Sequence, residues 1–361
     1  MALIVRGVVK DYDWGIVDGL LPWTGHSTQG PQAELWFGVH PGGPSPLLGD
    51  DGVDTGEHLG DRFDIEAIPL LVKILAAARP LSVQVHPRRA VAEAGYATQQ
   101  QSTGPRIYSD PFEKTELLVA LTAFEAFAGW RDSDVSSAML AAIPGGEQAA
   151  DLVRMGMLDD AIRCLLALSS PDRIAALPAA AEAAGLPSWS VAAYRTVART
   201  YPEDAGALIT PMLDVIRLEV GEAIYLPAGV PHSYISGTGL EVMTSSDNVV
   251  RLGLTTKPVF VDEAIAALVP DLRPQVLRTR HNEIIWPVNA PFVVRNLHSG
   301  SERIPAGAYR IALLIEGSAR VDTDGAELIL RPGTAAVLAA QDNDAFVHAD
   351  GLVAIVQSTV G

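Results

Sequence analysis

Two segments of the sequence carry residues that could bind a metal ion. In residues 81–87, LSVQVHP, apolar and polar residues alternate, which places Gln84 and His86 on the same face of an expected strand. In residues 221–232, GEAIYLPAGVPH, a tight Pro/Gly turn precedes His232 and fixes the direction of its imidazole. Imidazoles and an amide oxygen are suitable donors for a divalent cation. Each pattern alone also fits ordinary structure: a solvated edge strand for the first, and a histidine at the end of a hairpin for the second.

A third segment, residues 110–121, runs from charged residues into an apolar strand. The period of two puts Lys114 and Glu116 on one face of that strand. Alone, this pattern is also typical of the solvated start of a strand. Together, the three segments offer two imidazoles, one carboxylate and one amide oxygen, a set that suits zinc and leaves room for water or substrate. The sequence therefore predicts a metal site of mixed nitrogen and oxygen ligands.

Short strands broken by turns surround a helical stretch. Residues 3–130 are rich in Gly, Pro, aromatic and β-branched residues, and residues 214–254 and 282–360 return to short strand-like runs. Residues 132–201 instead show Ala and Leu at helical spacing, with Ser133 as the expected cap of the first helix. Repeated short strands predict a sandwich or barrel, and no glycine-rich loop between a strand and a helix supports a nucleotide fold.

The composition limits the class of protein and of partner. A chain of 361 residues, 48% of them hydrophobic, is expected to form about two or three compact units. The sequence has no run of about 18 apolar residues and no signal-peptide pattern, so we expect a cytoplasmic protein without a membrane partner. The net charge of −17 disfavours nucleic acid and requires any phosphate site to be a local basic cluster. The single cysteine, Cys164, lies in an apolar segment and is interpreted as a core residue.

Six segments resemble, in type and order, those of the type I mannose-6-phosphate isomerases, which are cupins. They are YDWG (12–15), AELWFGVHP (33–41), LSVQVHP (81–87), EKTE (113–116), LPAGVPH (226–232) and SDNVVRLGLT (246–255). The resemblance implies a mainly β protein with an α-helical insert: two cupin-type, jelly-roll β-barrels plus a helical domain. The implied domains are a catalytic cupin in two parts, 1–130 and 206–268, a helical insert, 131–205, and a C-terminal cupin, 269–361.

The resemblance also implies the metal and its ligands. One Zn²⁺ per chain is expected, and its ligands are Gln84, His86, Glu116 and His232. The sequence departs from the family pattern at Thr115, where the family has proline, without loss of a ligand. In the C-terminal cupin, residues 330–338 form a cupin-like turn that no histidine follows, and His348 stands alone. We interpret that domain as degenerate, metal-free and structural.

The reaction of the family is the reversible aldose-ketose isomerisation of mannose 6-phosphate and fructose 6-phosphate, through a metal-stabilised cis-enediol(ate) intermediate. Arg251 is the expected stabiliser of the enediolate, because a guanidinium does not titrate and its segment resembles the family's active-site strand. Four residues could transfer protons: Lys114, Asp247, Glu241 and His232. Lys114 together with Asp247 is the favoured pair, and which residue is the base stays open. Asp247 also fits an ordinary turn residue in the sequence SDN.

The residues expected to contact the sugar phosphate are Ser82, Trp14, Glu34, Tyr234, Glu241 and Lys257. Ser82 and Lys257, together with Arg251, would supply the donors to the phosphate. Trp14 also fits a packing residue. Two other functions stay open: another metal-dependent cupin enzyme, such as an iron oxygenase, and a non-catalytic cupin that binds sugar phosphates. We expect a monomer, with a weak homodimer as the alternative, and no nucleic-acid partner.

Overall fold

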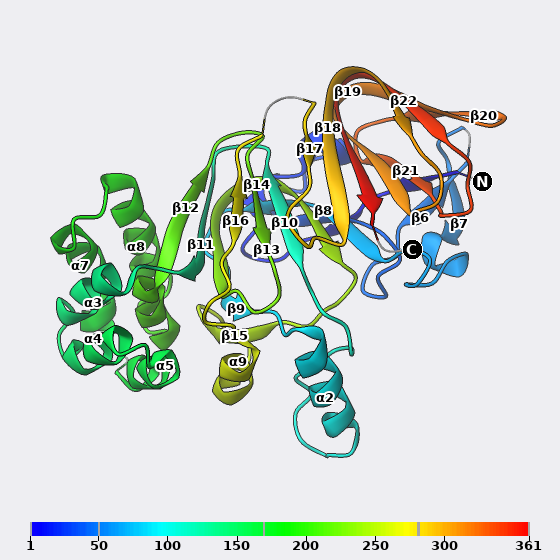
Figure 1. Ribbon diagram of the computed structural model, residues 1–361. Helices are drawn as coiled ribbons and strands as arrows, with labels where there is room; N and C mark the ends of the chain where they lie inside the picture. Colours follow the sequence, from blue (N-terminus) through cyan, green and yellow to red (C-terminus); the bar gives the residue numbers. More distant parts are fainter. Residues whose placement is uncertain (1, 50, 169, 280–281, 360–361) are drawn as a thin grey trace.

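The computed structural model describes residues 2–49, 51–168, 170–279 and 282–359. Within these residues the chain is mainly β with a helical part, as the sequence predicts. The helical part lies at one end of the molecule, an eleven-stranded sheet in the middle, and a nine-stranded sheet at the other end (Figure 1). A small sheet of β3 (Ile16–Val17) and β4 (Pro31–Gln32) completes the described strands.

The central, eleven-stranded sheet holds the strands on or beside which the predicted metal ligands lie. Its main order is β16-β13-β10-β14-β8-β5-β2. The long strand β14 joins its two parts, because it pairs with β8 and β10 along one stretch and with β9 and β11 along another. The strands are β2 (Val8–Lys10), β5 (Glu34–Phe37), β8 (Leu70–Ala77), β9 (Val83–Val85), β10 (Glu116–Ala120), β11 (Phe124–Trp130), β12 (Leu213–Leu218), β13 (Ala223–Leu226), β14 (His232–Thr244), β15 (Val250–Gly253) and β16 (Gln275–Leu277).

The second sheet combines the C-terminal strands with three strands from the start of the chain. Its order is β17-β18-β22-β19-β21-β1-β6-β7, with β20 paired to β19. Leu3 of β1 lies opposite Val337 of β21, so residues more than three hundred positions apart are neighbours. The strands are β1 (Leu3–Arg6), β6 (Pro46–Leu48), β7 (Asp54–His58), β17 (Ile284–Ile285), β18 (Phe292–Ile304), β19 (Arg310–Thr323), β20 (Ala326–Leu330), β21 (Thr334–Leu338) and β22 (Ala345–Ser358).

Most of the helices fall where the Ala/Leu periodicity predicts them. The exception at the start is the cap: Asp132, not Ser133, accepts the backbone N–H groups of the first turn, because a carboxylate there satisfies two free donors. The helices α1, α2 and α9 lie outside the stretch for which the sequence predicts helices. The helices are α1 (Leu21–Thr24), α2 (Arg89–Gln100), α3 (Ser133–Ala141), α4 (Glu147–Arg154), α5 (Leu158–Ala167), α6 (Pro171–Ala175), α7 (Leu177–Ala183), α8 (Ser188–Thr200) and α9 (Val261–Ala267), with 3₁₀ turns η1 (Leu59–Asp61) and η2 (Ala205–Met212).

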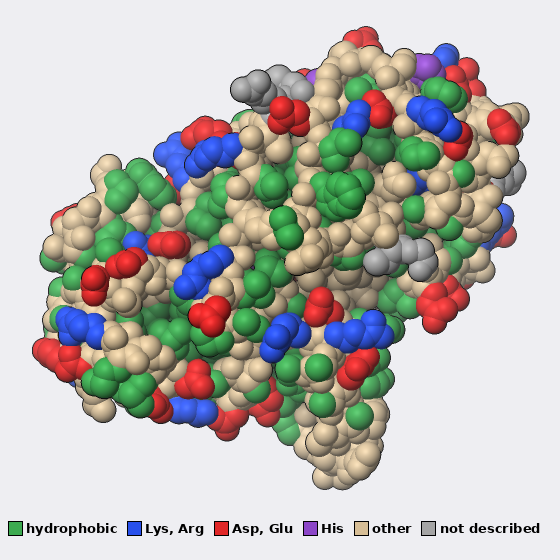
Figure 2. Space-filling view, viewed as in Figure 1, with side chains coloured by type: hydrophobic (Ala, Val, Ile, Leu, Met, Phe, Trp, Pro, Cys, Tyr) green, Lys and Arg blue, Asp and Glu red, His purple; other side chains and the backbone are tan. Residues whose placement is uncertain are grey.

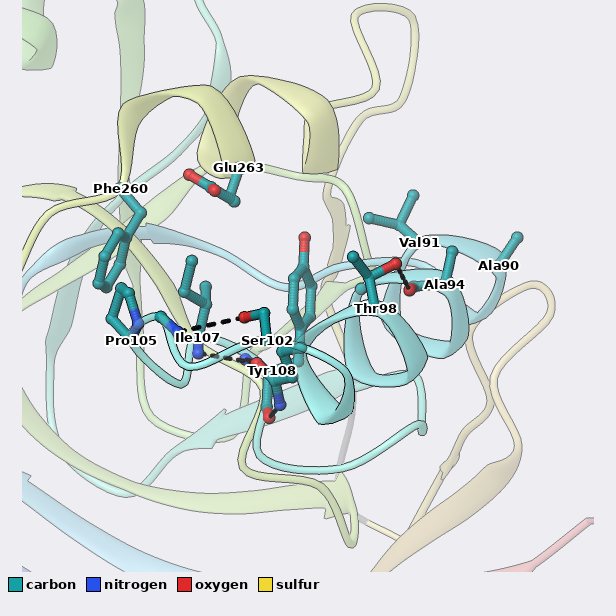
Figure 3. A pocket seen from close by; sticks show the side chains of 13 residues that line it. Ala90, Val91, Ala94, Thr98, Ser102, Pro105, Ile107, Tyr108, Phe260 and Glu263 are labelled. Carbon is teal, nitrogen blue, oxygen red and sulfur yellow. Dashed lines mark hydrogen bonds between the residues drawn. The ribbon is translucent and has the colours of Figure 1, made fainter.

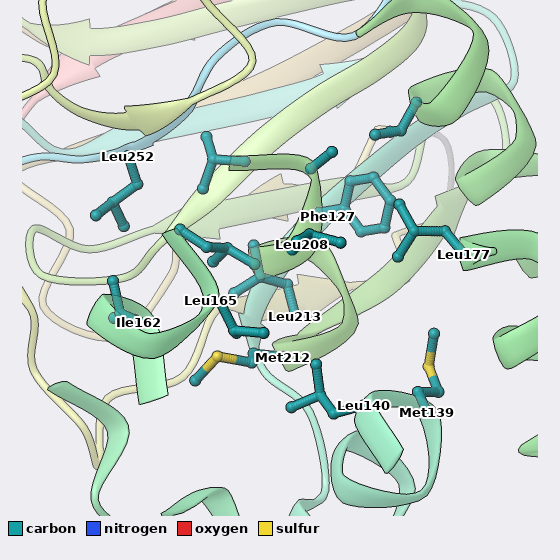
Figure 4. Close-up of a cluster of buried hydrophobic side chains, with 14 of the residues drawn as sticks. Phe127, Met139, Leu140, Ile162, Leu165, Leu177, Leu208, Met212, Leu213 and Leu252 are labelled. Carbon is teal, nitrogen blue, oxygen red and sulfur yellow. The ribbon is translucent and has the colours of Figure 1, made fainter. Parts of the chain in front are cut away.

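One apolar core joins the helical part to the edge of the central sheet. Leu140 and Leu165 from the helices pack in the same cluster as Phe127 of β11 and Leu252 of β15 (Figure 4). The contact is close at Gly253, where a Cβ atom would lie 2.3 Å from the Cα atom of Gly206 in η2. Only glycine fits such an approach of two backbones. The helical part therefore fixes the position of the strand that carries Arg251.

A second core fills the space between the two sheets. Phe37 of β5 and Val72 of β8 pack in one cluster with Phe292 of β18 and Ile311 of β19, and all four are fully buried. Burying side chains of this size stabilises the fold by about 1.5–3 kcal/mol each. The second sheet is thus held to the back of the central sheet by hydrophobic contact.

The outer surface carries charges of both signs. On the face shown in Figure 2, Lys and Arg side chains are scattered among Asp and Glu rather than gathered into one basic region. No helix in the described part of the chain has the length and hydropathy that a bilayer crossing requires.

Candidate metal centre and active site

Three of the four predicted ligands meet in the interior of the central sheet. His86 directly follows β9, Glu116 begins β10 and His232 begins β14, and their ligand atoms all lie within 4.8 Å of one another. The Nε2 atom of His86 is 3.2 Å from one oxygen of Glu116, and the Nε2 atom of His232 is 3.3 Å from the other. All three side chains are buried. The site is therefore a closed cluster of one carboxylate and two imidazoles.

The backbone fixes the tautomers of both imidazoles. The Nδ1 atom of His86 lies 2.8 Å from the carbonyl oxygen of Asn248, and that of His232 lies 3.1 Å from the carbonyl oxygen of Val230. Because a carbonyl only accepts, each Nδ1 must carry the proton, which leaves a lone pair on each Nε2. Both lone pairs face the Glu116 carboxylate. The Nε2 of His86 and one Glu116 oxygen have no hydrogen-bond partner although they are buried. Such orphaned acceptors are costly unless a cation lies between them.

The charge states of this cluster also suit a cation. Burial lowers the pKa of His86 to about 4, so its imidazole is neutral at pH 7. Burial alone would raise the pKa of the Glu116 carboxyl, but Lys114 and the two imidazoles hold it well below its usual range. The Lys114 ammonium lies 2.8 Å from the Glu116 carboxylate, which confirms that the two share a face.

Gln84 lies at the edge of the cluster, in a row of cross-strand neighbours. In the sheet, Gln84 is opposite His232 of β14 on one side and opposite Arg251 of β15 on the other. Side chains of such pairs are adjacent on one face. The amide nitrogen of Gln84 lies 3.1 Å from His232 Nε2, and its oxygen accepts a hydrogen bond of 3.1 Å from Ser82. Rotating the Gln84 amide by half a turn about its last side-chain bond would exchange its nitrogen and oxygen, so that the oxygen faces the cluster. The amide group occupies nearly the same volume in both orientations.

Two basic side chains near this row have no acidic partner among the described residues. Neither Arg251 nor Lys257 forms an ion pair there; Arg251 is partly buried and Lys257 is exposed. Burial and the charge of Arg251 lower the pKa of Lys257, which indicates that the two cations lie near each other. Burial also lowers the pKa of Arg251. In a chain of net charge −17, this pair is a local basic cluster that an anion would stabilise.

A buried ion cluster next to the site contains one residue that the sequence did not single out. Lys73 of β8 lies 3.0 Å from Glu241 of β14 and 3.6 Å from Glu34 of β5. Burial alone would lower the pKa of Lys73, but the two carboxylates raise it above its ordinary value. Trp36 donates a 2.8 Å hydrogen bond to Glu34. Two predicted sugar-contacting carboxylates therefore share the single positive charge of a lysine that lies in an otherwise apolar run, LLVKILAA.

The remaining predicted residues lie in the same region. Trp14 packs against a cluster that contains Tyr234, and its ring stacks on Tyr12 with ring centres 5.7 Å apart. Burial, with Glu241 adding to it, raises the pKa of Tyr234 well above its ordinary value. Asp247 is half-exposed, and its carboxylate contacts His40. The structure thus brings together residues from separate strands and loops of the central sheet.

Comparison with known proteins gives the family. The model of the phosphomannose isomerase type I catalytic domain matches residues 3–133. The mannose-6-phosphate isomerase of Escherichia coli strain K12 is 31% identical over 384 residues, which cover 96% of this chain and 97% of that protein. The chain belongs to the type I phosphomannose isomerases. A relative from this family in Arabidopsis thaliana, mannose-6-phosphate isomerase 1, is 30% identical and covers 89% of the chain and 85% of its own length.

Solved structures of phosphomannose isomerases share the whole fold. A variant of the enzyme from Salmonella typhimurium has a TM-score of 0.83 and 28% identity, with complete coverage of both chains. A mannose 6-phosphate isomerase solved with zinc and yttrium bound has a TM-score of 0.82 and 28% identity, and covers 99% of this chain and all of its own. The mainly β architecture with a helical part is therefore that of the family.

A separate cavity of about 670 Å³ lies outside the cluster of predicted site residues. It is lined by α2, the loop that follows α2, and α9, and Tyr108 extends from the loop toward α9, which carries Glu263 (Figure 3). None of the predicted ligands, catalytic residues or substrate contacts lines it. A hydrogen bond of 2.8 Å from the Ser109 amide to the Asn248 side chain connects its wall to the metal centre.

Proposed function

We propose that this chain interconverts mannose 6-phosphate and fructose 6-phosphate and binds one zinc ion through Gln84, His86, Glu116 and His232. The observation that carries the proposal is the convergence of two fixed Nε2 lone pairs and a buried carboxylate, with orphaned acceptors among them. Two imidazoles and one carboxylate are a common zinc donor set, and the Gln84 amide oxygen can complete four ligands. Membership of the phosphomannose isomerases supports the substrate.

A bound zinc ion would polarise substrate oxygens and so ease removal of the neighbouring proton. Arg251 and Lys257, which have no acidic partner in the described chain, would bind the phosphate and the negative charge that develops on the sugar oxygens. Asp247 is half-exposed and ionised, so it can accept a proton, and Lys114 can return one from its place beside Glu116. These roles agree with an isomerisation that moves a proton between two adjacent carbons.

A coupled assay tests the function directly. Purified protein should convert mannose 6-phosphate to fructose 6-phosphate, lose the activity after chelation and dialysis, and regain it when zinc is added at one equivalent per chain. Activity that survives removal of all bound metal would contradict the zinc proposal. Binding of the sugar phosphate without turnover would instead favour the non-catalytic alternative, and oxygen uptake would favour an oxygenase.

We also propose the finer architecture and state of the enzyme. The chain would form two cupin-type jelly-roll barrels, with a catalytic cupin at 1–130 and 206–268, a helical insert at 131–205 and a degenerate cupin at 269–361. Most strands of the central sheet come from the first cupin and most of the second sheet from the other, while β1, β6, β7 and β16 cross between them. The helices α3 to α8 lie inside the proposed insert, which supports that boundary. A monomer in the cytoplasm is expected, and size-exclusion chromatography and cell fractionation would test these two points.

A further inference from the structure

A buried histidine outside the predicted site contacts the carboxylate of Asp247. His40 lies in the turn that follows β5, and it is 7% exposed. Its Nε2 atom is 2.9 Å from an oxygen of the Asp247 carboxylate. Its Nδ1 atom accepts a 3.0 Å hydrogen bond from the backbone N–H of Gly42. The imidazole therefore links the turn to the site.

The backbone of the turn decides which ring nitrogen carries the proton. The N–H of Gly42 is a permanent donor, so Nδ1 must present a lone pair to it. The proton of the neutral ring is then on Nε2, where it is donated to Asp247. The ring is held in place by Trp36, whose ring lies edge-on to it at 5.0 Å between centres and 87° between planes. A fixed donor thus points at the carboxylate.

Asp247 needs such a partner, because little else holds its carboxylate. Its backbone N–H donates a 2.9 Å hydrogen bond to the side chain of Asp110, which anchors the main chain but not the carboxylate. The side chain of Asp247 is 51% exposed and free to turn without a fixed donor. The hydrogen bond from His40 also lowers the pKa of the Asp247 carboxyl, which keeps it ionised. Orientation and charge state both depend on the same contact.

We propose that His40 is a positioning residue: its Nε2–H orients the Asp247 carboxylate toward the substrate for proton transfer. The inference rests on the proposed role of Asp247 in catalysis. His40 itself does not need to touch the sugar. Its contribution is one oriented hydrogen bond to a charged group, and losing a bond of this kind lowers turnover about ten- to hundredfold.

Two isosteric variants separate positioning from folding. In His40→Gln, the amide nitrogen can take the place of Nε2 and donate to Asp247. In His40→Asn, the shorter side chain can accept from Gly42 but cannot reach Asp247. We expect His40→Gln to retain most of the turnover and His40→Asn to lose about ten- to hundredfold in kcat, with KM, zinc content and Tm little changed in both. Equal kcat values for the two variants, or a loss that follows Tm, would overturn the proposal.

A double-variant cycle identifies the group through which His40 acts. If His40 works through Asp247, then His40→Asn combined with Asp247→Asn should be no slower than Asp247→Asn alone, because the carboxylate to be oriented is already gone. Losses that multiply would mean that His40 acts by another route, and would overturn the inference. Full turnover of Asp247→Asn by itself would refute the proposed role of Asp247, and with it the inference. If the wild-type chain does not catalyse the isomerisation at all, the proposed function itself is refuted.

Discussion

Replacing Arg251 with lysine separates the contribution of an oriented guanidinium from that of positive charge. Arg251 is the cross-strand neighbour of Gln84, and Gln84 is the cross-strand neighbour of His232. The Arg251 side chain therefore belongs to the row of side chains beside the metal centre. Its one hydrogen bond to a described residue is a weak one, 3.4 Å to the carbonyl oxygen of Val249. The variant therefore removes little that holds the fold together.

The size of the effect follows from these contacts. Lysine keeps one positive charge, so no buried anion is left unpaired, but it loses the planar fork of donors. Removing one oriented donor to a developing oxyanion costs about a hundred- to thousandfold in kcat, or roughly 2.7–4 kcal/mol. The loss should fall mainly on kcat, because the charge on the sugar oxygens develops in the transition state. A smaller rise in KM is expected if the same side chain contacts the phosphate.

Steady-state kinetics with mannose 6-phosphate measure both constants, and elemental analysis checks that zinc content is unchanged. Arg217→Lys is the matched control: Arg217 is exposed on β12, where it pairs with Glu219, and should change neither constant. Equal turnover of wild type and Arg251→Lys, or a loss confined to KM, would show that Arg251 binds or supports structure and that the developing charge is stabilised elsewhere.

Four further outcomes are expected. His232→Ala should abolish most zinc retention and activity, whereas His348→Ala should affect neither; metal analysis of both variants decides this. Cys164→Ser should lower the unfolding free energy by about 1 kcal/mol and leave kcat unchanged, because Cys164 is partly buried and packs against the core; a selective loss of turnover at constant Tm would contradict this structural role. Lys73→Met should destabilise the fold by about 3–5 kcal/mol in chemical denaturation, because it leaves two buried carboxylates unpaired. Hydrogen bonds from a side chain and the backbone lower the pKa of Asp18 in the folded protein. The stability that the ionised carboxylate contributes is therefore fully present above the pKa of the unfolded chain and is lost as the pH falls through the lower pKa of the folded protein. The difference in unfolding free energy between wild type and Asp18→Asn should shrink below about pH 4.

Local patterns predict the direction of each expected ligand within its own segment, whereas the meeting of the three segments was implied by the family resemblance. The period of two along residues 81–87 puts Gln84 and His86 on one face, and a Pro/Gly turn leads His232 into its strand; the structure has His232 as the first residue of β14. The same reasoning placed Lys114 beside Glu116. In each case the relevant residues are separated by only a few positions, so the pattern of the strand is sufficient.

The residues that sequence reasoning missed act through distant contacts. Lys73 lies in an apolar run, and its partners Glu34 and Glu241 belong to other strands, so no local pattern reveals the cluster. His40 appears in a turn, and only the fold shows that Asp247 lies against it. The helix α2 is a different case, since its alternation of Ala and polar residues was a local signal that the β-rich texture around it obscured.

His348 illustrates the reverse situation. It appears isolated in the sequence, yet the fold places it 2.7 Å from the Ser301 hydroxyl and 3.1 Å from the Asp322 carboxylate. All three come from neighbouring strands of the second sheet, and the pairing of those strands decides the contact. A histidine that has no polar neighbours in the sequence can therefore still have polar partners in the fold, because strands distant along the chain pair with its own.

The pairing of β1 with β21 has a consequence for how the protein is made. A ribosome adds about 5–20 residues per second, so the first strand is synthesised roughly 15–70 s before its partner exists. Once β6 has been made, Ile4 and Val5 can pair with it on one side, while the other edge of β1 stays open until β21 is made. Open edges of this kind pair readily with other chains. The newborn chain is therefore most exposed to aggregation at its beginning, and removing the last strands would leave this edge of β1 permanently uncovered.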